Sequence, residues 1–448
     1  MLNLYSLEKI KRIHIEITAN CNSACPQCER FIKHDFSEDI YQPEHKNLKQ
    51  GDISPVIRDI QGSKGHMTFD TFKNCINEIT VQNLRCIEFN GTWGDAIMHP
   101  QLNQFIDHVI ECKENIMEIN PENRLGVKLC SNAAIRPTSW WSNLAKQQER
   151  LNQLSLEYNG KEADDNRVVF AIDGLDNITH QMYRRGCEYE RVIENAQAYI
   201  DAGGRAEWQW IEFKHNEHQL DDALELARKM GFKDFFTRGN RAIKEHFLRE
   251  EVHKPGKVKS VDENFKSIVN KDSESQKTLD KKLKKVEEVK NKTITYSTKA
   301  RAEGQRIREK SLKKLETKYD GDIRKFLNKE PIKCEWGNKG MINVEFNGMV
   351  HPCCHMNVYM NRVWRNKGIS NDYEIMQKAY ESNWNNLNQH TLQDILLHSY
   401  YMNDLEESWD NERLQRLEMC KDNCTQQIDE KAFPIANSLM KPQKVEQQ

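Results

Sequence analysis

RIHIEIT at residues 12–18 is followed almost at once by CNSACPQC at residues 21–28. The first stretch alternates polar and apolar residues and is rich in β-branched side chains, which predicts a strand that runs into a loop. The second stretch places Cys21, Cys25 and Cys28 in that loop, with three residues between the first two and two between the last two. Such closely spaced thiolates can bind one metal centre. In a cluster of four irons, three cysteines leave one iron open for another ligand.

Zinc and disulfides are less favoured explanations of these cysteines. Zinc in structural sites prefers four protein ligands, usually in two-residue knuckles, and a lone trio fits this poorly. The chain has 13 cysteines, and its first residues lack a charged start followed by an apolar run. This combination argues for metal binding in a reducing compartment, so we expect a cytoplasmic protein. No stretch approaches the roughly 18 apolar residues of a membrane span, so we expect no membrane contact.

Strands and helices are expected to alternate between residues 13 and 237. The chain of 448 residues suggests two to three domains, and its net charge of −2 gives no global argument for nucleic acid. The patterns predict strands at 12–18, 86–89, 126–133, 168–172, 206–213 and 232–237, and helices at 69–79, 102–118, 138–153, 192–202 and 220–230. This alternation indicates parallel βα units with right-handed crossovers, which close into a full or partial barrel. We therefore expect an α/β fold with a partial (βα)₆ TIM-like barrel.

Polar residues follow several of the predicted strands. Gly94 and Asp95 come after the second strand, Ser131 and Asn132 after the third, and Asp173 after the fourth. Active sites of such barrels lie at the carboxyl ends of the strands, so these residues and the cysteine trio are expected on one face. Glycine lets the backbone approach a ligand closely, and a carboxylate suits an ammonium group.

The cysteine spacing resembles the radical S-adenosylmethionine (SAM) superfamily. The resemblance implies a [4Fe–4S] cluster on Cys21, Cys25 and Cys28, whose open iron chelates the amino and carboxylate groups of SAM. An electron from the cluster then splits the sulfonium and releases a 5′-deoxyadenosyl radical. We expect residues 1–245 to form this core.

The same resemblance extends to the polar residues after the strands. Gly94-Asp95 resembles the Gly-Glu of the loop that holds the SAM amino group. Ser131-Asn132 resembles a segment near the SAM ribose, and Asp173 resembles an acidic residue that faces the active site. Arg184-Arg185-Gly186 is either a site for anionic substrate groups or a solvated turn.

Composition changes after the core, in residues 246–330. Lysine and glutamate dominate there, and the sparse apolar residues are helix-spaced. Such a segment is more often a solvated helical linker than a surface for RNA or an acidic partner, and its few aromatics argue against stacking on single strands. We expect a charged, partly helical insert. The polar stretch 33–66 is expected to be a surface loop, with a substrate lid as the alternative.

The last region, residues 331–448, contains a predicted hairpin over 341–350 with Asn347-Gly348 as its turn. Cysteines flank it and recur near the end of the chain: Cys334, Cys353, Cys354, Cys420 and Cys424. This pattern resembles a small twitch domain, a shortened form of the SPASM extension. The resemblance implies a second [4Fe–4S] cluster on Cys334, Cys353, Cys420 and Cys424, with Cys354 as the alternative to Cys353. Structural zinc in a Cys₄ site is the rival assignment.

The sequence thus predicts a radical SAM enzyme with an auxiliary cluster. Its expected substrate is a peptide, a protein or a small molecule that undergoes oxidation, and its expected electron donor is a flavodoxin or ferredoxin. An RNA-modifying radical SAM enzyme is one alternative, although nucleic acid is not favoured. A non-catalytic metal-binding interaction protein with structural zinc is the other. The remaining cysteines are expected to be small core residues: Cys75, Cys86, Cys112, Cys130 and Cys187.

Overall fold

The computed structural model describes residues 4–23, 25, 28, 65–213, 215–239, 313, 316–322, 329–357, 383–409 and 417–425. Most of the predicted loop at 33–66 and of the predicted insert at 246–330 lies outside the described residues. In the part of the chain that is described, no helix has the length and apolar character needed to cross a membrane.

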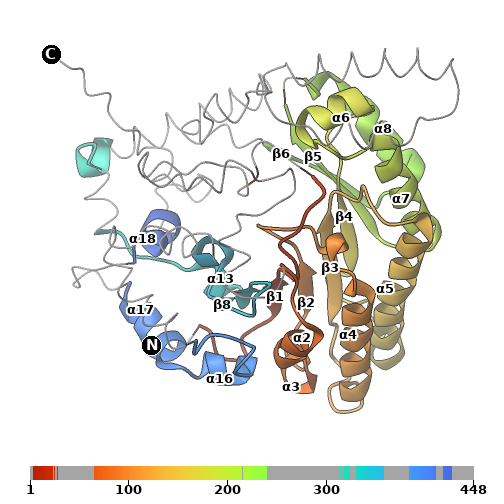
Figure 1. Cartoon of the computed structure of the whole chain (residues 1–448). Coiled ribbons are helices and arrows are strands. Elements are labelled where there is room, and N and C mark those ends of the chain that lie inside the picture. The colour runs from red at the N-terminus through yellow and green to blue at the C-terminus, as the bar shows by residue number, and fades with distance from the viewer. Residues whose placement is uncertain are drawn as a thin grey trace, which may run out of the picture.

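One sheet of eight strands organises the structure, with the spatial order β6-β5-β4-β3-β2-β1-β7-β8 (Figure 1). The first six strands are parallel and adjacent in sequence order. They are β1 (Arg12–Ile15), β2 (Cys86–Phe89), β3 (Gly126–Ser131), β4 (Arg167–Ala171), β5 (Ala206–Glu212) and β6 (Asp234–Gly239). This arrangement confirms the α/β class and the run of βα units. Barrel closure stays a prediction, because β6 pairs only with β5 among the described strands.

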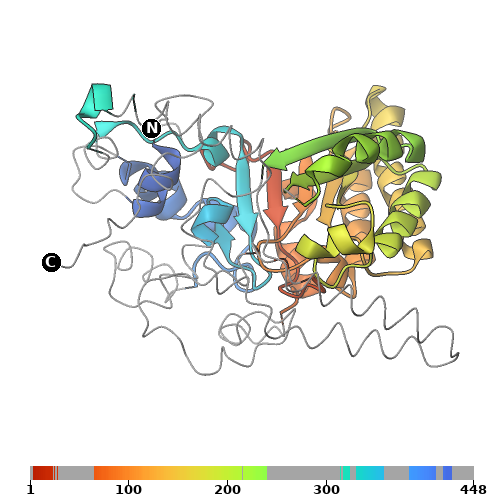
Figure 2. The same ribbon diagram turned by 90° about the horizontal axis from the view of Figure 1, so that it is seen from above.

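Helices connect these strands and lie together along one side of the sheet (Figures 1 and 2). α4 packs against α5, and α5 packs against α7. The helices of this layer are α2 (Phe69–Cys75), α3 (Glu78–Val81), α4 (Leu102–Ile116), α5 (Thr138–Asn159), α6 (Asn177–Tyr183), α7 (Tyr189–Asp201) and α8 (Leu220–Met230). The predicted helix at 69–79 is two helices, because the side chain of Asn77 accepts hydrogen bonds from Ile79 N and Thr80 N and starts a new one.

Alternation along β1 separates a core face from a polar face. Ile13 and Ile15 are fully buried in the apolar core that they share with the helices, including Phe72 of α2. Successive side chains of a strand point to opposite faces, so His14 lies on the other face. In register it is the neighbour of Glu88 on β2. We call the face of the sheet that points away from the helices its inner face. This face is polar at His14 and Glu88, whereas a filled TIM barrel carries bulky apolar side chains inside.

The C-terminal region begins on the same sheet rather than on a separate one. β7 (Met341–Val344) pairs in parallel with β1, and β8 (Val350–His351) pairs antiparallel with β7. In the turn between them, Gly348 N donates to Glu345 O at 2.8 Å, and Gly348 has a φ of +89°, which favours glycine. The helices of this region lie beyond this edge of the sheet (Figure 1). α13 (Glu335–Asn338) precedes β7, and α16 (Leu392–Leu396), α17 (Leu405–Glu407) and α18 (Glu418–Cys424) follow β8. The division into residues 1–245, 246–330 and 331–448 stays a prediction.

Candidate functional site

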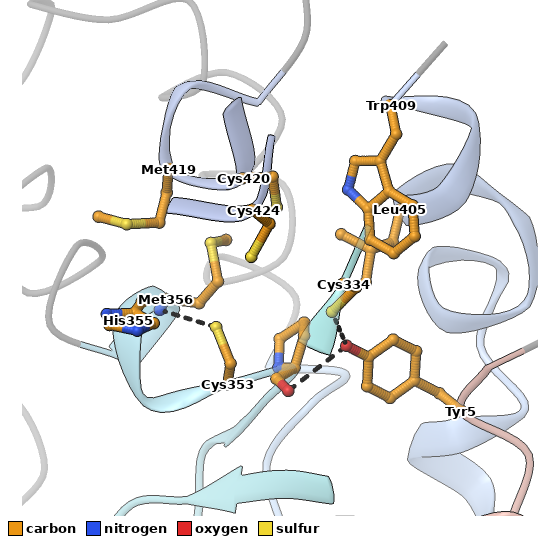
Figure 3. Close-up of a pocket in the computed structure, with 11 residues that line it drawn as sticks. Tyr5, Cys334, Cys353, His355, Met356, Leu405, Trp409, Met419, Cys420 and Cys424 are labelled. Atoms are coloured by element: carbon orange, nitrogen blue, oxygen red, sulfur yellow. Dashed lines mark hydrogen bonds between the residues drawn. The ribbon is translucent and has the colours of Figure 1, made fainter. Parts of the chain in front are cut away.

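Four cysteines from three separate segments line one cavity (Figure 3). Cys334 caps the start of α13, Cys353 follows β8, and Cys420 and Cys424 lie on α18, one helical turn apart. A backbone hydrogen bond from Lys333 N to Cys424 O, at 2.8 Å, brings the first and last of these segments together. The other lining residues are Tyr5, Pro352, His355, Met356, Leu405, Trp409 and Met419. These are the same four cysteines that the twitch-like pattern brought together in the sequence.

Hydrogen-bond donors from the chain point at the sulfur atoms of this site. Gly337 N donates to Cys334 Sγ and Met356 N donates to Cys353 Sγ, each at 3.4 Å. The Tyr5 hydroxyl lies 3.1 Å from Cys334 Sγ. A hydrogen bond with the side chain of Cys424 lowers the pKa of Cys334. Such donors stabilise thiolates and tune the potential of iron–sulfur clusters.

The four thiols of this site suit a metal centre by their chemistry. They surround a cavity with a mainly apolar lining. Four cysteines can bind either a [4Fe–4S] cluster or structural zinc, so the residues fit the predicted cluster, and zinc stays the rival assignment. Cys354 is half-buried and does not line the cavity.

The three N-terminal cysteines follow β1 at the carboxyl edge of the sheet. Cys25 is buried against Tyr183 and Phe213, and Cys28 packs beside it. Cys28 N donates to Cys25 O at 3.0 Å, which holds these two cysteines in one turn. Ser23 serves both neighbouring thiols: its N donates to Cys21 Sγ at 3.4 Å, and its Oγ lies 3.0 Å from Cys25 Sγ. Three thiols in one short loop suit the predicted cluster by their chemistry, and their ligation of a metal centre stays a prediction.

Asp95 joins two of the predicted loops. Its Oδ2 accepts hydrogen bonds from Ser131 Oγ at 3.1 Å and from Asn132 N at 2.8 Å. Asn132 in turn directs Nδ2 at Cys21 Sγ, 3.7 Å away. Gly94 is needed at the neighbouring position, because a Cβ there would lie 2.1 Å from Thr18 O. Four of the predicted cofactor-binding residues therefore meet beside the cysteine trio.

Asp95 is more enclosed than the sequence suggested. The carboxylate is buried, and burial raises its pKa from the ordinary value. Its Oδ1 also accepts from Ile97 N at 3.3 Å, so protein donors occupy both oxygens. Asp95 thus links its own loop to the loop of Ser131 and Asn132. Direct contact between Asp95 and SAM stays a prediction.

Asp173 is connected to the N-terminal cysteine site through Arg184. It is fully buried and forms an ion pair with Arg184, whose Nε lies 2.6 Å from Asp173 Oδ2. The Nη1 atom of Arg184 points at Cys25 Sγ, 3.8 Å away. Arg184 is thus a mostly buried cation beside a thiol, with its side chain 14% exposed, and the alternative of a solvated turn is wrong for this residue.

Two polar residues on the inner face of the sheet were not singled out in the sequence. Glu16 is almost fully buried, and burial raises its pKa to about 8. His14 is also buried, and neither of its ring nitrogens has a hydrogen-bond partner among the described residues. Its ring lies 5.5 Å from that of Trp336, two residues after Cys334. The alternation in RIHIEIT was the signal that could have found both residues.

The remaining five cysteines have three kinds of surroundings. Cys75, Cys86 and Cys112 are buried core residues, as expected. Cys187 is buried as well, but Asn22 Nδ2 lies 3.9 Å from its sulfur, so it sits beside the N-terminal cysteine site. Cys130 is half-buried on β3.

Comparisons with known proteins give structural neighbours only. No family model and no curated protein matches the sequence. Native anSMEcpe with bound AdoMet is 14% identical, with 95% of this chain and 94% of that chain covered and a TM-score of 0.42. Streptococcus suis SuiB bound to precursor peptide SuiA is 12% identical, with 92% and 76% covered and a TM-score of 0.36. With TM-scores below 0.5, this likeness carries no argument about the activity of the present chain.

Proposed function

We propose that this chain is a radical SAM enzyme with two [4Fe–4S] clusters. Cys21, Cys25 and Cys28 would hold the first cluster, and Cys334, Cys353, Cys420 and Cys424 the second. The observation that carries the proposal is the meeting of Asp95, Ser131 and Asn132 with Cys21 at the carboxyl edge of a parallel sheet. Parallel α/β sheets bind their ligands at this edge.

The protein groups have distinct tasks in this proposal. When bound, the first cluster supplies the electron that cleaves SAM to methionine and a 5′-deoxyadenosyl radical. Gly94, Asp95, Ser131 and Asn132 position the loops that receive SAM. Arg184 places positive charge beside Cys25. Burial of these groups excludes water from the site, which protects reactive species.

The inner face of the sheet is the proposed substrate side. A row of polar residues runs across it in register: Asn343, His14, Glu88, Lys128 and Arg167. Glu88 forms an ion pair with Lys128 at 2.9 Å, whereas the ring of His14 keeps its hydrogen-bonding capacity. Such a surface suits a polar substrate, and we favour a peptide or protein over a small molecule. A flavodoxin or ferredoxin would supply electrons, and the second cluster would accept an electron or anchor the substrate.

Metal analysis after anaerobic reconstitution tests the proposal. Two clusters predict about eight irons per chain with matching sulfide and little zinc. About four irons with one zinc would keep the SAM chemistry but make the C-terminal site structural. Zinc without iron would support the metal-binding interaction protein instead.

Replacing Asp95 with alanine is expected to weaken SAM binding and to leave the iron content unchanged. The variant leaves buried donors at Asn132 N and Ser131 Oγ without their acceptor. Each such group destabilises the folded loops by about 1–3 kcal/mol. Only part of this cost acts on SAM binding, so a loss of roughly tenfold to a hundredfold in affinity, or about 1.4–2.8 kcal/mol, is expected. Calorimetric titration of SAM measures it. Asp70→Ala, at an exposed aspartate on α2, is the matched control. Unchanged affinity in Asp95→Ala would remove Asp95 from the SAM site.

Replacing Arg184 with alanine is expected to lower the reduction potential of the first cluster. A cation beside Cys25 Sγ favours the reduced, more negative cluster. If solvent screening leaves an attraction of about 1 kcal/mol between Arg184 and the added electron, the reduction potential should fall by roughly 40 mV when the charge is removed. A redox titration followed by electron paramagnetic resonance (EPR) measures the shift. Arg184→Lys keeps the charge and should stay nearer to the unchanged protein. Equal potentials in all three proteins would show that the charge of Arg184 does not act on the cluster.

A further inference from the structure

A buried hydrogen-bond network joins the loop before Asp95 to the segment after Cys353. The amide of Asn357 is its centre. Asn357 Nδ2 donates to Glu16 Oε1 at 3.1 Å, and Asn357 Oδ1 accepts from Trp93 Nε1 at 3.0 Å. Glu16 Oε2 accepts from the backbone N of Thr92 at 2.9 Å and of Trp93 at 3.0 Å. The amide of Asn357 and the carboxyl group of Glu16 therefore fix both the backbone and the side chain of this loop.

The same amide is attached to the C-terminal cysteine site. Asn357 N donates to Cys353 O at 3.2 Å, so the two residues share one helical turn. Asn357 Nδ2 also donates to Asn343 Oδ1 on β7 at 2.9 Å. Any shift of Cys353 that moves this turn would move the amide away from Glu16 and Trp93.

The other end of the network reaches the N-terminal cysteine site. Trp93 precedes Gly94 and Asp95, and Asp95 N donates to Asn20 O at 2.9 Å, next to Cys21. Asp95 then holds Asn132, whose side chain points at Cys21 Sγ. A continuous path of hydrogen bonds and short chain segments thus runs from Cys353 to Cys21.

The network has little freedom to rearrange. Asn357 is 0% exposed, Glu16 1% and Trp93 4%. The indole ring of Trp93 is also packed against Ala19 and Phe346. Buried polar groups that lose their partners are costly, so the loop and the turn hold their positions together. Sites joined by such a network influence each other reciprocally.

We propose that Asn357 is a positioning residue that couples the C-terminal cysteine site to the SAM loop. An ordered second site would hold the turn 353–357, and this turn would hold residues 92–95 in the conformation that binds SAM. The proposal deepens the proposed function and depends on it. It assigns no contact between Asn357 and SAM.

The test compares SAM affinity with stability in reconstituted full-length variants. Trp93→Phe removes the indole N–H and keeps a ring, and Asn357→Ala removes the whole amide. Trp141→Phe is the matched control, because Trp141 is equally buried and its Nε1 donates to Ile135 O at 3.2 Å, away from the network. We expect both network variants to keep their iron and to bind SAM about tenfold more weakly. The control should bind SAM normally even where its melting temperature falls.

A double-mutant cycle separates coupling from local damage. Removing Cys420 and Cys424 by alanine substitution should weaken SAM binding in the parent chain, with no further loss when combined with Asn357→Ala. Normal SAM affinity in both network variants, or fully additive losses in the cycle, would overturn the coupling. A parent chain that holds iron but binds no SAM would instead contradict the proposed function itself.

Discussion

The Cys21→Ala, Cys25→Ala, Cys28→Ala triple variant is expected to contain about four irons per chain instead of about eight. It is also expected to produce no 5′-deoxyadenosine from SAM. The triple variant lacks the three proposed thiolate ligands of the first cluster. The donors that point at the sulfurs of Cys21 and Cys25, from Ser23, Asn132 and Arg184, then have no thiolate to contact. The second site lies on other segments of the chain and should keep its cluster.

Cys86→Ala is the control for this variant. Cys86 is a buried residue of β2 and lies outside both proposed sites. Its replacement should leave the iron content and SAM cleavage unchanged. Full iron content in the triple variant would contradict the assignment of the first cluster.

Replacing Cys353 is expected to remove the second cluster, whereas replacing Cys354 is not. Cys353 is 7% exposed, lines the cavity and accepts a hydrogen bond from Met356 N. Cys354 is half-buried and lies outside the lining. We therefore expect about four irons in Cys353→Ala and about eight in Cys354→Ala. Iron analysis with EPR spectra of the reduced proteins distinguishes the two sites.

The adjacent positions make these two variants a matched pair. Loss of iron in Cys354→Ala alone would make Cys354 the ligand. Loss of zinc rather than iron in Cys353→Ala would make the C-terminal site a structural zinc site. The melting temperature should fall in Cys353→Ala, because a cluster that binds only the folded chain stabilises it.

Local patterns were sufficient to predict the parallel strands. The strand predicted at 86–89 is β2 (Cys86–Phe89), and the apolar run at 168–172 overlaps β4 (Arg167–Ala171). Both follow from short-range patterns of side chains, which a single sequence displays. The pairing of β7 with β1 joins residues about 330 positions apart, as in Arg12 with Met341. No pattern within either strand specifies such a partner.

The cysteines of the candidate sites could be predicted from their spacing in the sequence. The resemblance to a twitch domain grouped Cys334, Cys353, Cys420 and Cys424, and the structure brings these four to one cavity. The coupling residue Asn357 could not be found in this way. A lone asparagine is common in turns, and its role arises only because folding places it against Glu16.

Arg184 and Asp95 show a second limit. The sequence left Arg184 open between a ligand and a solvated turn, because charge alone does not reveal burial. Its pairing with Asp173 and its position beside Cys25 arise only in the fold, which brings residue 184, at the end of α6, next to both. Asp95 was predicted to face SAM. In the structure both of its carboxyl oxygens already accept hydrogen bonds from the backbone, from Ile97 N and Asn132 N.

Formation of 5′-deoxyadenosine tests the central claim most directly. The reconstituted full chain is mixed anaerobically with SAM and dithionite, and the products are measured by mass spectrometry. The proposed function predicts 5′-deoxyadenosine and methionine in equal amounts, with neither product formed by the Cys21, Cys25 and Cys28 triple variant. A chain that carries its full iron content and yet cleaves no SAM under reduction would contradict the assignment as a radical SAM enzyme.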